Sequence, residues 1–411
     1  MEIRKRRDVL LAMTPYSPRR SDGVRRFALE AGWNLIDSTR LVGGLDGLSD
    51  WRGDGVIATL RDDPATTAFV RRLSRARIPV VDLTIQRPDI KVPRVCLDNA
   101  AVGRVAAEHF KEFNHRNAAW FSTHWMNVHA QRFAGFCEAW NAGGSRSRAT
   151  AADAQRRVPP DVGHDGDMVP ERWVLSEGVP PGRRNDARAV ARWLSARLNA
   201  APKPLALFCH CIEDASRLLA ECGASGIRVP EEIAVLTAGD DPMACEMQPV
   251  PLSCVPLQGE RHGYEAAALL QRLMDGEPPP RSPCLVRPGD VDVRASTNWT
   301  AAADPLVAKA LALVAGNLSR PWGVAQLSRE LGVPPLRIGV HFKAELGRTP
   351  GEEILRQRLS KARTLLRETG MTVEEIAVQC GFCHASYLSN LFRREIGMTP
   401  RKWRNATLPD A

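Results

Sequence analysis

The chain has 411 residues, 44% hydrophobic and 25% charged, which is typical of a globular protein with two or three domains. No apolar run approaches the roughly 18 residues of a membrane span, and the N-terminal MEIRKRRDVLLAM lacks a small-residue cleavage site. These features argue against a membrane protein or a secreted one, and they predict a cytoplasmic location.

The formal net charge of +9 is concentrated near the C-terminus, where residues 320–404 hold 15 Lys and Arg against 8 Asp and Glu. Such a local excess predicts salt-dependent attraction to a polyanion. Ten cysteines are too dilute for a disulfide scaffold. Neither Cys209-His210-Cys211 nor the pair Cys380 and Cys383 has an obvious second pair of zinc ligands, so we expect no metal and no cofactor.

Residues 8–293 alternate short apolar runs with amphipathic helices, such as those expected at 65–77 and 102–113. This alternation predicts a parallel sheet covered on both faces, with ligands at the carboxyl ends of its strands. The runs that we interpret as strands are RRDVLLAM, GWNLID, DGVIATL, IPVVDL, RVCLDN, NAAWFST, PLALFCH and IAVLTAGD. The loops expected to carry a site are residues 14–20, 98–99, 122–132, 209–214 and 239–242.

Several segments of residues 8–295 resemble the sensor domain of LacI/GalR-type repressors, which is related to periplasmic sugar-binding proteins. The resemblance implies a two-lobed α/β domain that binds a small effector between its lobes. It depends on Asp54-Gly55-Val56-Ile57, Asp98-Asn99 at the start of a helix, Gln131-Arg132-Phe133-Ala134-Gly135-Phe136, Val229-Pro230-Glu231, the loop Thr237 to Asp241, Leu252-Ser253-Cys254-Val255 and Gly263-Tyr264-Glu265-Ala266-Ala267.

Asp98, Arg132 and Asp240 match effector-contacting positions of that family. The carboxylates of Asp98 and Asp240 can accept hydrogen bonds from sugar hydroxyls, and the guanidinium of Arg132 can donate hydrogen bonds to them. Tyr16 and Arg19 in the first loop are further candidates. Tyr16 could place its ring against a sugar face, and Arg19 could supply another hydrogen-bond donor. For each of the five, a loop-capping or surface role is the alternative.

Cys211-Ile212 stands where the family usually has an Asn-Asp or Thr-Asp pair. This difference removes hydrogen-bonding capacity from the expected cleft.

Residues 141–170 lack apolar periodicity and are interpreted as an exposed insertion or flexible loop. The strand pattern ends near residues 296–304. Asp304 is expected to cap a helix that has Pro305 in its first turn. The predicted division is a sensor domain at 1–297, a linker at 298–304 and an all-α domain at 305–411.

The most informative stretch is TVEEIAVQCGFCHASYLSNLFRREIGMTPRKWR at residues 372–404. A short helix from 374 to 380, a Gly381-Phe382 turn, and a helix from about His384 form a predicted helix-turn-helix. Leu388, Leu391 and Phe392 face inward in this pattern. Periodicity then leaves a small polar face suited to a DNA major groove, and cations beyond it suited to phosphates. The candidate DNA contacts here are Ala385, Ser386, Ser389, Asn390, Arg393 and Arg394.

A first, weaker unit is expected at residues 324–342, with Gly332-Val333 as its turn. Its candidate DNA contacts are Arg337 and Lys343, while Pro334-Pro335 and Gly339 are unusual for such a unit. A long helix at 351–368, with Ile354, Leu359, Ala362, Leu365 and Leu366 on its apolar face, is expected to join the two units.

Residues 305–404 resemble the DNA-binding domain of AraC/XylS-type regulators, through the Gly-Phe turn, the Phe392-Arg393 pair, Gly397-Met398-Thr399-Pro400 and the closing Trp403-Arg404. A LacI-like sensor followed by such a domain resembles the bacterial xylose-operon regulators. That resemblance implies a homodimeric, sequence-specific transcription regulator of carbohydrate genes, which binds double-stranded DNA operators and a monosaccharide, a pentose among the candidates.

Two alternatives are weighed against the regulator. One is an enzyme, for which we find no nucleophile elbow, P-loop or metal constellation. The other is an effector sensor whose C-terminal domain has degenerated into a protein-interaction module, as Pro334-Pro335 and Gly339 suggest.

Overall fold

The computed structural model describes residues 6–13, 17–38, 51–61, 64–142, 170–302 and 304–407. Its strands are β1 (Asp8–Ala12), β2 (Asn34–Asp37), β3 (Gly55–Ala58), β4 (Val80–Asp82), β5 (Val95–Leu97), β6 (Asn117–Ser122), β7 (Glu171–Val174), β8 (Leu205–Cys209), β9 (Ile233–Gly239), β10 (Ser253–Pro256) and β11 (Cys284–Val286).

The helices of the α/β part are α1 (Pro18–Ala31), α2 (Pro64–Arg75), α3 (Asn99–Glu112), α4 (Asn127–Asn141), α5 (Leu175–Gly178), the 3₁₀ turn η3 (Pro181–Arg183), α6 (Ala187–Ala200), α7 (Ile212–Ala224), α8 (Pro242–Glu246) and α9 (Gly259–Met274). The helices after residue 304 are α10 (Pro305–Gly316), α11 (Val324–Leu331), α12 (Pro335–Leu346), α13 (Pro350–Glu368), α14 (Val373–Gln379), α15 (Ala385–Ile396) and α16 (Pro400–Thr407).

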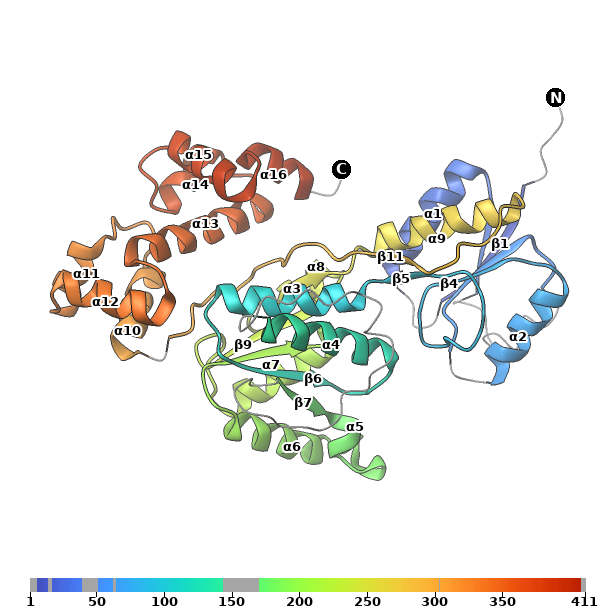
Figure 1. Ribbon diagram of the computed structural model, residues 1–411, viewed down its shortest axis with the longest axis horizontal. Coiled ribbons are helices and arrows are strands. Elements are labelled where there is room, and N and C mark those ends of the chain that lie inside the picture. The colour runs from blue at the N-terminus through green and yellow to red at the C-terminus, as the bar shows by residue number, and fades with distance from the viewer. Residues whose placement is uncertain are drawn as a thin grey trace.

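The first lobe is a parallel sheet in the order β2-β1-β3-β4, with the parallel pair β11-β5 beside it through a bridge from Asp82 to Arg94 (Figure 1). Residues that alternate along each strand face opposite sides. Val9 and Leu11 join the core under α1 and α9, whereas Leu10 and Ala12 join the core under α2. Both faces are therefore covered.

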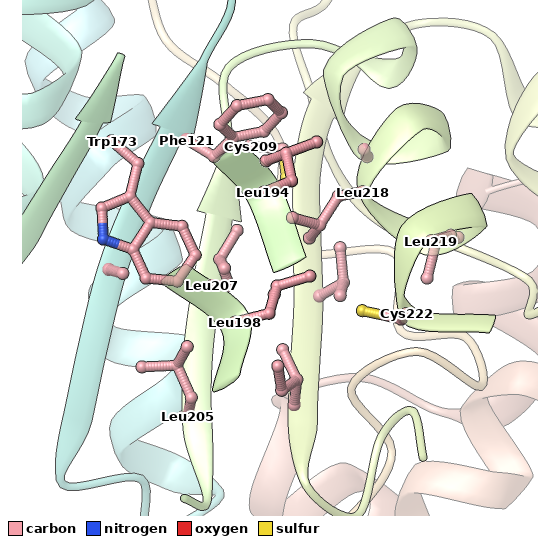
Figure 2. Close-up of a cluster of buried hydrophobic side chains, with 14 of the residues drawn as sticks. Phe121, Trp173, Leu194, Leu198, Leu205, Leu207, Cys209, Leu218, Leu219 and Cys222 are labelled. Carbon is pink, nitrogen blue, oxygen red and sulfur yellow. The ribbon is translucent and has the colours of Figure 1, made fainter. Parts of the chain in front are cut away.

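The second lobe is a five-stranded parallel sheet in the order β10-β9-β8-β6-β7. Trp120 and Phe208 pack against α3 and α4, and on the other face Phe121 and Leu207 pack against α6 and α7. Figure 2 shows this second core, with Trp173 of β7 beside leucines from α6 and β8. The chain passes between the lobes after β5 and after β10, where α3 and α9 begin.

The region after residue 304 is entirely helical in its described part and contains two cores. One core unites α10, α11 and α12, and the other unites α14, α15 and Trp403 of α16. α13 contributes Ile354 to the first core and Leu359, Ala362 and Leu366 to the second, which confirms its predicted joining role.

The predicted strands correspond to β1–β6, β8 and β9, and their parallel pairing confirms the expected α/β class. Asp304 caps α10 as expected, because its carboxylate accepts from the backbone N–H groups of Leu306 and Val307. Tyr16 and most of the predicted insertion, residues 143–169, lie outside the described residues. In the part of the chain that is described, no helix has the length and apolar character of a membrane span.

Candidate nucleic-acid interface and effector site

The second helix-turn-helix unit forms at α14 and α15, one residue from the predicted limits. A capping box begins α14, in which Thr372 accepts from the backbone N–H of Glu375 and Glu375 accepts from that of Thr372. Gly381 has φ of +77°, and a Cβ there would lie 2.3 Å from the carbonyl oxygen of Leu318. Only glycine fits this turn. Phe382 fills the corner with 5% of its surface exposed, as predicted.

α15 buries Leu388, Leu391 and Phe392 and thereby turns its opposite face outward. Ser386 and Asn390 are exposed on that face, while Ala385 and Ser389 are half-buried beside them. All four side chains are small. Ser386, Ser389 and Asn390 can donate hydrogen bonds to base edges or accept them, whereas Ala385 can contact a thymine methyl.

The cations follow in the last turn of α15. Arg393 and Arg394 are exposed, and Arg394 forms an ion pair of 2.8 Å with Glu395, which is also exposed. Such a surface pair is weak, so a phosphate can replace its carboxylate at little cost.

The first unit has the same scaffold with a different surface. Gly332, at φ of +65°, forms its turn, and α12 buries Ile338 and Phe342. Arg337 and Lys343 are exposed as predicted, but the face between them also presents Leu336, 81% exposed, and Val340, 58% exposed. Direct hydrogen bonding to bases can come from Arg337, whereas the two apolar side chains can only contact methyl groups.

The sensor and the helical region meet around Glu353 of α13, which is 1% exposed. Its carboxylate accepts from Arg348 at 2.6 Å, from Arg356 at 2.9 Å and from the Thr300 hydroxyl at 2.5 Å. Burial opposes its charge, yet the Arg356 and Thr300 hydrogen bonds and the charge of Arg348 lower the pKa of Glu353 to about 2. Glu353 is therefore a carboxylate at neutral pH.

The end of α3 completes this junction. The guanidinium of Arg356 lies 4.3 Å from the ring centroid of Phe113, and Arg348 donates to the carbonyl oxygen of Glu112 at 3.2 Å. On the adjoining segment, Arg116 forms an ion pair with Glu345 of α12 at 3.5 Å. The C-terminal end of α3 thus contacts both α12 and α13.

At the other end of α3, a group of side chains gathers where the chain passes between the lobes. We call it the interlobe cluster and define it by what its members share, a position at the carboxyl ends of the strands or in a helix next to them. Its members are Arg20, Asn99, His129, Arg132, His210 and Asp240.

Arg132 is the centre of the cluster and is 4% exposed. It donates to the carbonyl oxygen of His210 at 2.7 Å and to Oδ1 of Asn99 at 3.0 Å. The rings of His129 and His210 stack with centroids 3.7 Å apart. Burial and the neighbouring Arg132 charge lower the pKa of both histidines, to about 4 for His129, so both rings are neutral at pH 7.

Asp240 lies at the end of β9 and accepts from the backbone N–H groups of Leu257 at 2.7 Å and Gly259 at 2.9 Å. A Cβ on Gly259 would lie 2.7 Å from Oδ2 of Asp240 and 3.1 Å from Cβ of Arg19. The start of α9, the first turn of α1 and the Asp240 carboxylate therefore meet closely. Arg20 lies in that first turn. Burial raises the pKa of Asp240, and the charge of Arg20 opposes that rise.

The structure places the predicted effector residues unevenly. Arg132 and Asp240 belong to one cluster. Arg19 lies beside it but is exposed, and it stands in the first turn of α1 instead of in the expected loop. Asp98 caps α3 by accepting from the N–H of Ala101 at 2.9 Å, which is the capping role given above as the alternative. An effector role for Asp98, Asp240, Arg19 or Arg132 stays a prediction.

Arg20, His129 and His210 lie within the loops that were expected to carry a site, residues 14–20, 122–132 and 209–214, but sequence reasoning did not select them individually as site residues. Arg20 could have been found from its position at the start of a helix after the first strand. The histidines have no such local signal, because their stacking depends on the packing of α4 against the end of β8.

Comparison with known proteins covers both parts of the chain. The family model of a periplasmic binding protein-like domain matches residues 107–297, and that of a helix-turn-helix domain matches residues 327–406. The xylose operon regulatory protein of Escherichia coli K12 is 26% identical over 92% of this chain and 90% of its own length. The activator RhaR of Klebsiella pneumoniae is 35% identical over 25% of this chain and 36% of its own length.

Among solved structures, one described as the xylose-binding transcription activator XylR aligns with a TM-score of 0.59 at 22% identity. The alignment covers 99% of this chain and 100% of that one. The sensor region also aligns with a transcriptional regulator CelR in complex with cellobiose, at a TM-score of 0.52 and 23% identity, over 71% of this chain and 85% of the other.

The fold and these matches define a DNA-binding transcription regulator with a periplasmic-binding-protein-like sensor domain. More particularly, the chain combines that sensor with a helix-turn-helix domain and is similar along nearly its whole length to the xylose operon regulatory protein of Escherichia coli.

Proposed function

We propose that this regulator controls carbohydrate-utilisation genes in response to a small sugar or sugar derivative bound at the interlobe cluster, a pentose being one candidate. Two observations support this. Relatives with the same domains are described as regulators of a xylose operon, and Arg132 and Asp240 lie together where the lobes join. Tyr16, Arg19 and Asp98 remain candidate effector contacts.

We further propose that α15 reads base edges with Ala385, Ser386, Ser389 and Asn390, while Arg393 and Arg394 contact phosphates. Arg337 and Lys343 of α12 would contact a second, adjacent segment of the major groove. The observation that carries this proposal is the outward polar face of α15 beside its two arginines. The apolar surface at Leu336 and Val340 favours a mainly positioning role for α12.

The coupling would pass through α3. Its first residue, Asn99, accepts from Arg132 in the interlobe cluster, and the residue after its last turn, Phe113, lies against Arg356. A helix of fourteen residues is about 21 Å long and stiff, so a tilt at one end moves the other. An effector shifts the protein toward DNA binding only by its differential affinity for the two lobe arrangements.

We also propose the division into a sensor at 1–297, a linker at 298–304 and a DNA-binding domain at 305–411, assembly as a homodimer, a cytoplasmic location and no enzymatic activity. Sedimentation equilibrium of the full chain, with and without operator DNA, tests the dimer. A constant monomer mass in both conditions would contradict it.

A salt titration tests the central proposal. Fluorescence anisotropy should show that the full chain binds a duplex selected from random sequence, with log affinity falling steeply against log salt concentration. The same titration with the selected site scrambled measures specificity. A degenerate protein-interaction module would bind neither duplex, and this outcome would refute the DNA-binding proposal.

A further inference from the structure

The interlobe cluster contains more hydrogen-bond donors than its own acceptors satisfy. Nε of Arg20 and Nε of Arg132 are both buried and have no hydrogen-bond partner among the described residues. Nδ1 of His210 is in the same condition. A buried guanidinium N–H without an acceptor is costly, so two of them where the lobes join point to a bound group that supplies one.

Two carboxylates, Asp240 of the cluster and Asp98 beside it, already accept hydrogen bonds. Both oxygens of Asp240 accept backbone N–H groups, at 2.7 and 2.9 Å. Oδ1 of Asp98 caps α3 at 2.9 Å, and its Oδ2 lies 3.8 Å from a guanidinium nitrogen of Arg104. A neutral sugar presents hydroxyls that must donate as well as accept, and the protein's own N–H groups already occupy part of the capacity of these carboxylates to receive them.

The charges of the cluster also favour an anionic ligand. Arg20 and Arg132 contribute two positive charges to the cluster, and Asp240 is the carboxylate that opposes both. The stacked histidines His129 and His210 are neutral and add no counter-charge. At the start of α7, the side chains of Cys211 and Ile212 provide neither an anion nor strong hydrogen bonds.

We infer that the effector carries an oxyanion, the carboxylate of a sugar acid or the phosphate of a sugar phosphate, that is held by Arg20 and Arg132. This inference rests on the proposed function, because it names the chemical class that the same cluster would bind. A guanidinium gives an oxyanion two parallel charge-assisted hydrogen bonds, and the bound anion neutralises a buried positive charge. The hydroxyls of a neutral pentose can accept from these N–H groups but bring no charge to oppose the two guanidinium ions.

The experiment measures thermal unfolding of the full chain with matched probes at constant ionic strength. The probes are D-galacturonate against D-galactose, D-glucose 6-phosphate against D-glucose, and inorganic phosphate against chloride. A ligand at ten times its Kd stabilises the native state by RT ln 11, which should raise the Tm by about 2–4 °C. We expect such a shift from at least one anionic probe and none from its neutral partner, and the two anionic arms distinguish carboxylate from phosphate.

Arg20→Gln is the preferred variant, because the structure shows no protein hydrogen bond made by the described Arg20 side chain that the change would break. It should abolish the anion-induced shift. Arg132→Gln should do the same, but it also loses contacts to His210 and Asn99, so its folding must be checked by circular dichroism. Arg192→Gln removes the same charge from an exposed site on α6 and should keep the full shift.

A neutral sugar that stabilises the chain as strongly as its acid or phosphate would overturn the inference. So would the absence of any shift with all anionic probes, or an equal shift in Arg20→Gln. Operator binding by anisotropy is measured on the same preparations. If one of these results is obtained while the chain binds its operator, only the anionic effector is refuted. If the unmodified chain does not bind an operator at all, the proposed function itself is refuted.

Discussion

The two helix-turn-helix units share a scaffold and differ in their surfaces. Both turn at a glycine with positive φ, Gly332 and Gly381, and both bury a helix face containing a phenylalanine. The first unit then exposes Leu336 and Val340, and the second exposes Ser386 and Asn390. The scaffold is set by packing and backbone conformation. What each unit can recognise is set by a few outward residues that packing does not restrict.

The largest expected difference between the units concerns their turns. Gly381→Ala forces a Cβ against the Leu318 carbonyl oxygen at positive φ and should cost roughly 3 kcal/mol or more, whereas Gly332→Ala meets open space and should cost about 1–2 kcal/mol. Urea unfolding followed by circular dichroism measures both values. Equal losses would show that the two turns are under the same constraint.

The second expected effect concerns how the first unit is tied to the sensor. Glu353→Gln leaves Arg348 and Arg356 without their shared carboxylate and should destabilise the chain by roughly 2–4 kcal/mol. Glu374→Gln is the matched control on the second unit. Glu374 is exposed, so Glu374→Gln should change the free energy of unfolding by no more than about 0.5 kcal/mol. A neutral result for Glu353→Gln would mean that the junction does not depend on this carboxylate.

The same carboxylate gives a dependence on pH. Its pKa is lowered from 4.5 to about 2 in the folded chain, so the unfolded chain binds the proton more readily. The stability that Glu353 contributes is complete above pH 4.5 and is lost as the pH falls through about 2. As the pH falls from 4.5 to about 2, the difference in the free energy of unfolding between the unmodified chain and Glu353→Gln should therefore shrink. A difference that stays constant would contradict the assignment.

A smaller effect separates base recognition between the units. Asn390→Ala should lose roughly 1–3 kcal/mol of discrimination between the selected operator and a scrambled duplex. Arg337→Ala should lose less, because its neighbours on α12 are apolar. Anisotropy with both duplexes measures these values. A larger loss of specificity from Arg337→Ala would reverse the proposed division of labour.

The smallest effect should come from a phosphate contact. Arg393→Ala should weaken binding to every duplex alike and reduce the slope of log affinity against log salt by about one. Arg394→Ala should reduce the slope by a similar amount, because its surface ion pair with Glu395 is weak and a phosphate can replace the carboxylate. A sequence-dependent loss from Arg393→Ala would instead place that side chain on a base edge.

The sequence predicted the helix-turn-helix better than the effector site, and the reason is physical. The turn at Gly381-Phe382 and the buried face of α15 depend on neighbours within about twenty residues, so periodicity and a positive-φ glycine were sufficient to predict them. The approach of Arg20 to Asp240 depends on the docking of α1, α9 and β9, which are far apart in the chain.

Asp98 illustrates a second limit of sequence reasoning. An aspartate before a helix suits a cap and a ligand equally well, and only the coordinates show its Oδ1 engaged by Ala101. Glu353 was not singled out at all. Within an amphipathic helix it resembles an ordinary surface glutamate until Thr300 and Arg348 fold over it.

The shared helix α13 has a consequence for promoter architecture. Because the continuous helix α13 holds Ile354 in one core and Ala362 in the other, it fixes the distance between α12 and α15 and their relative orientation. If α12 and α15 contact two segments of one duplex as proposed, inserting about five base pairs between these segments would carry one of them to the far side of the duplex, while inserting about ten would bring it back. Mutational drift in the length of such a promoter element is therefore constrained by the pitch of DNA.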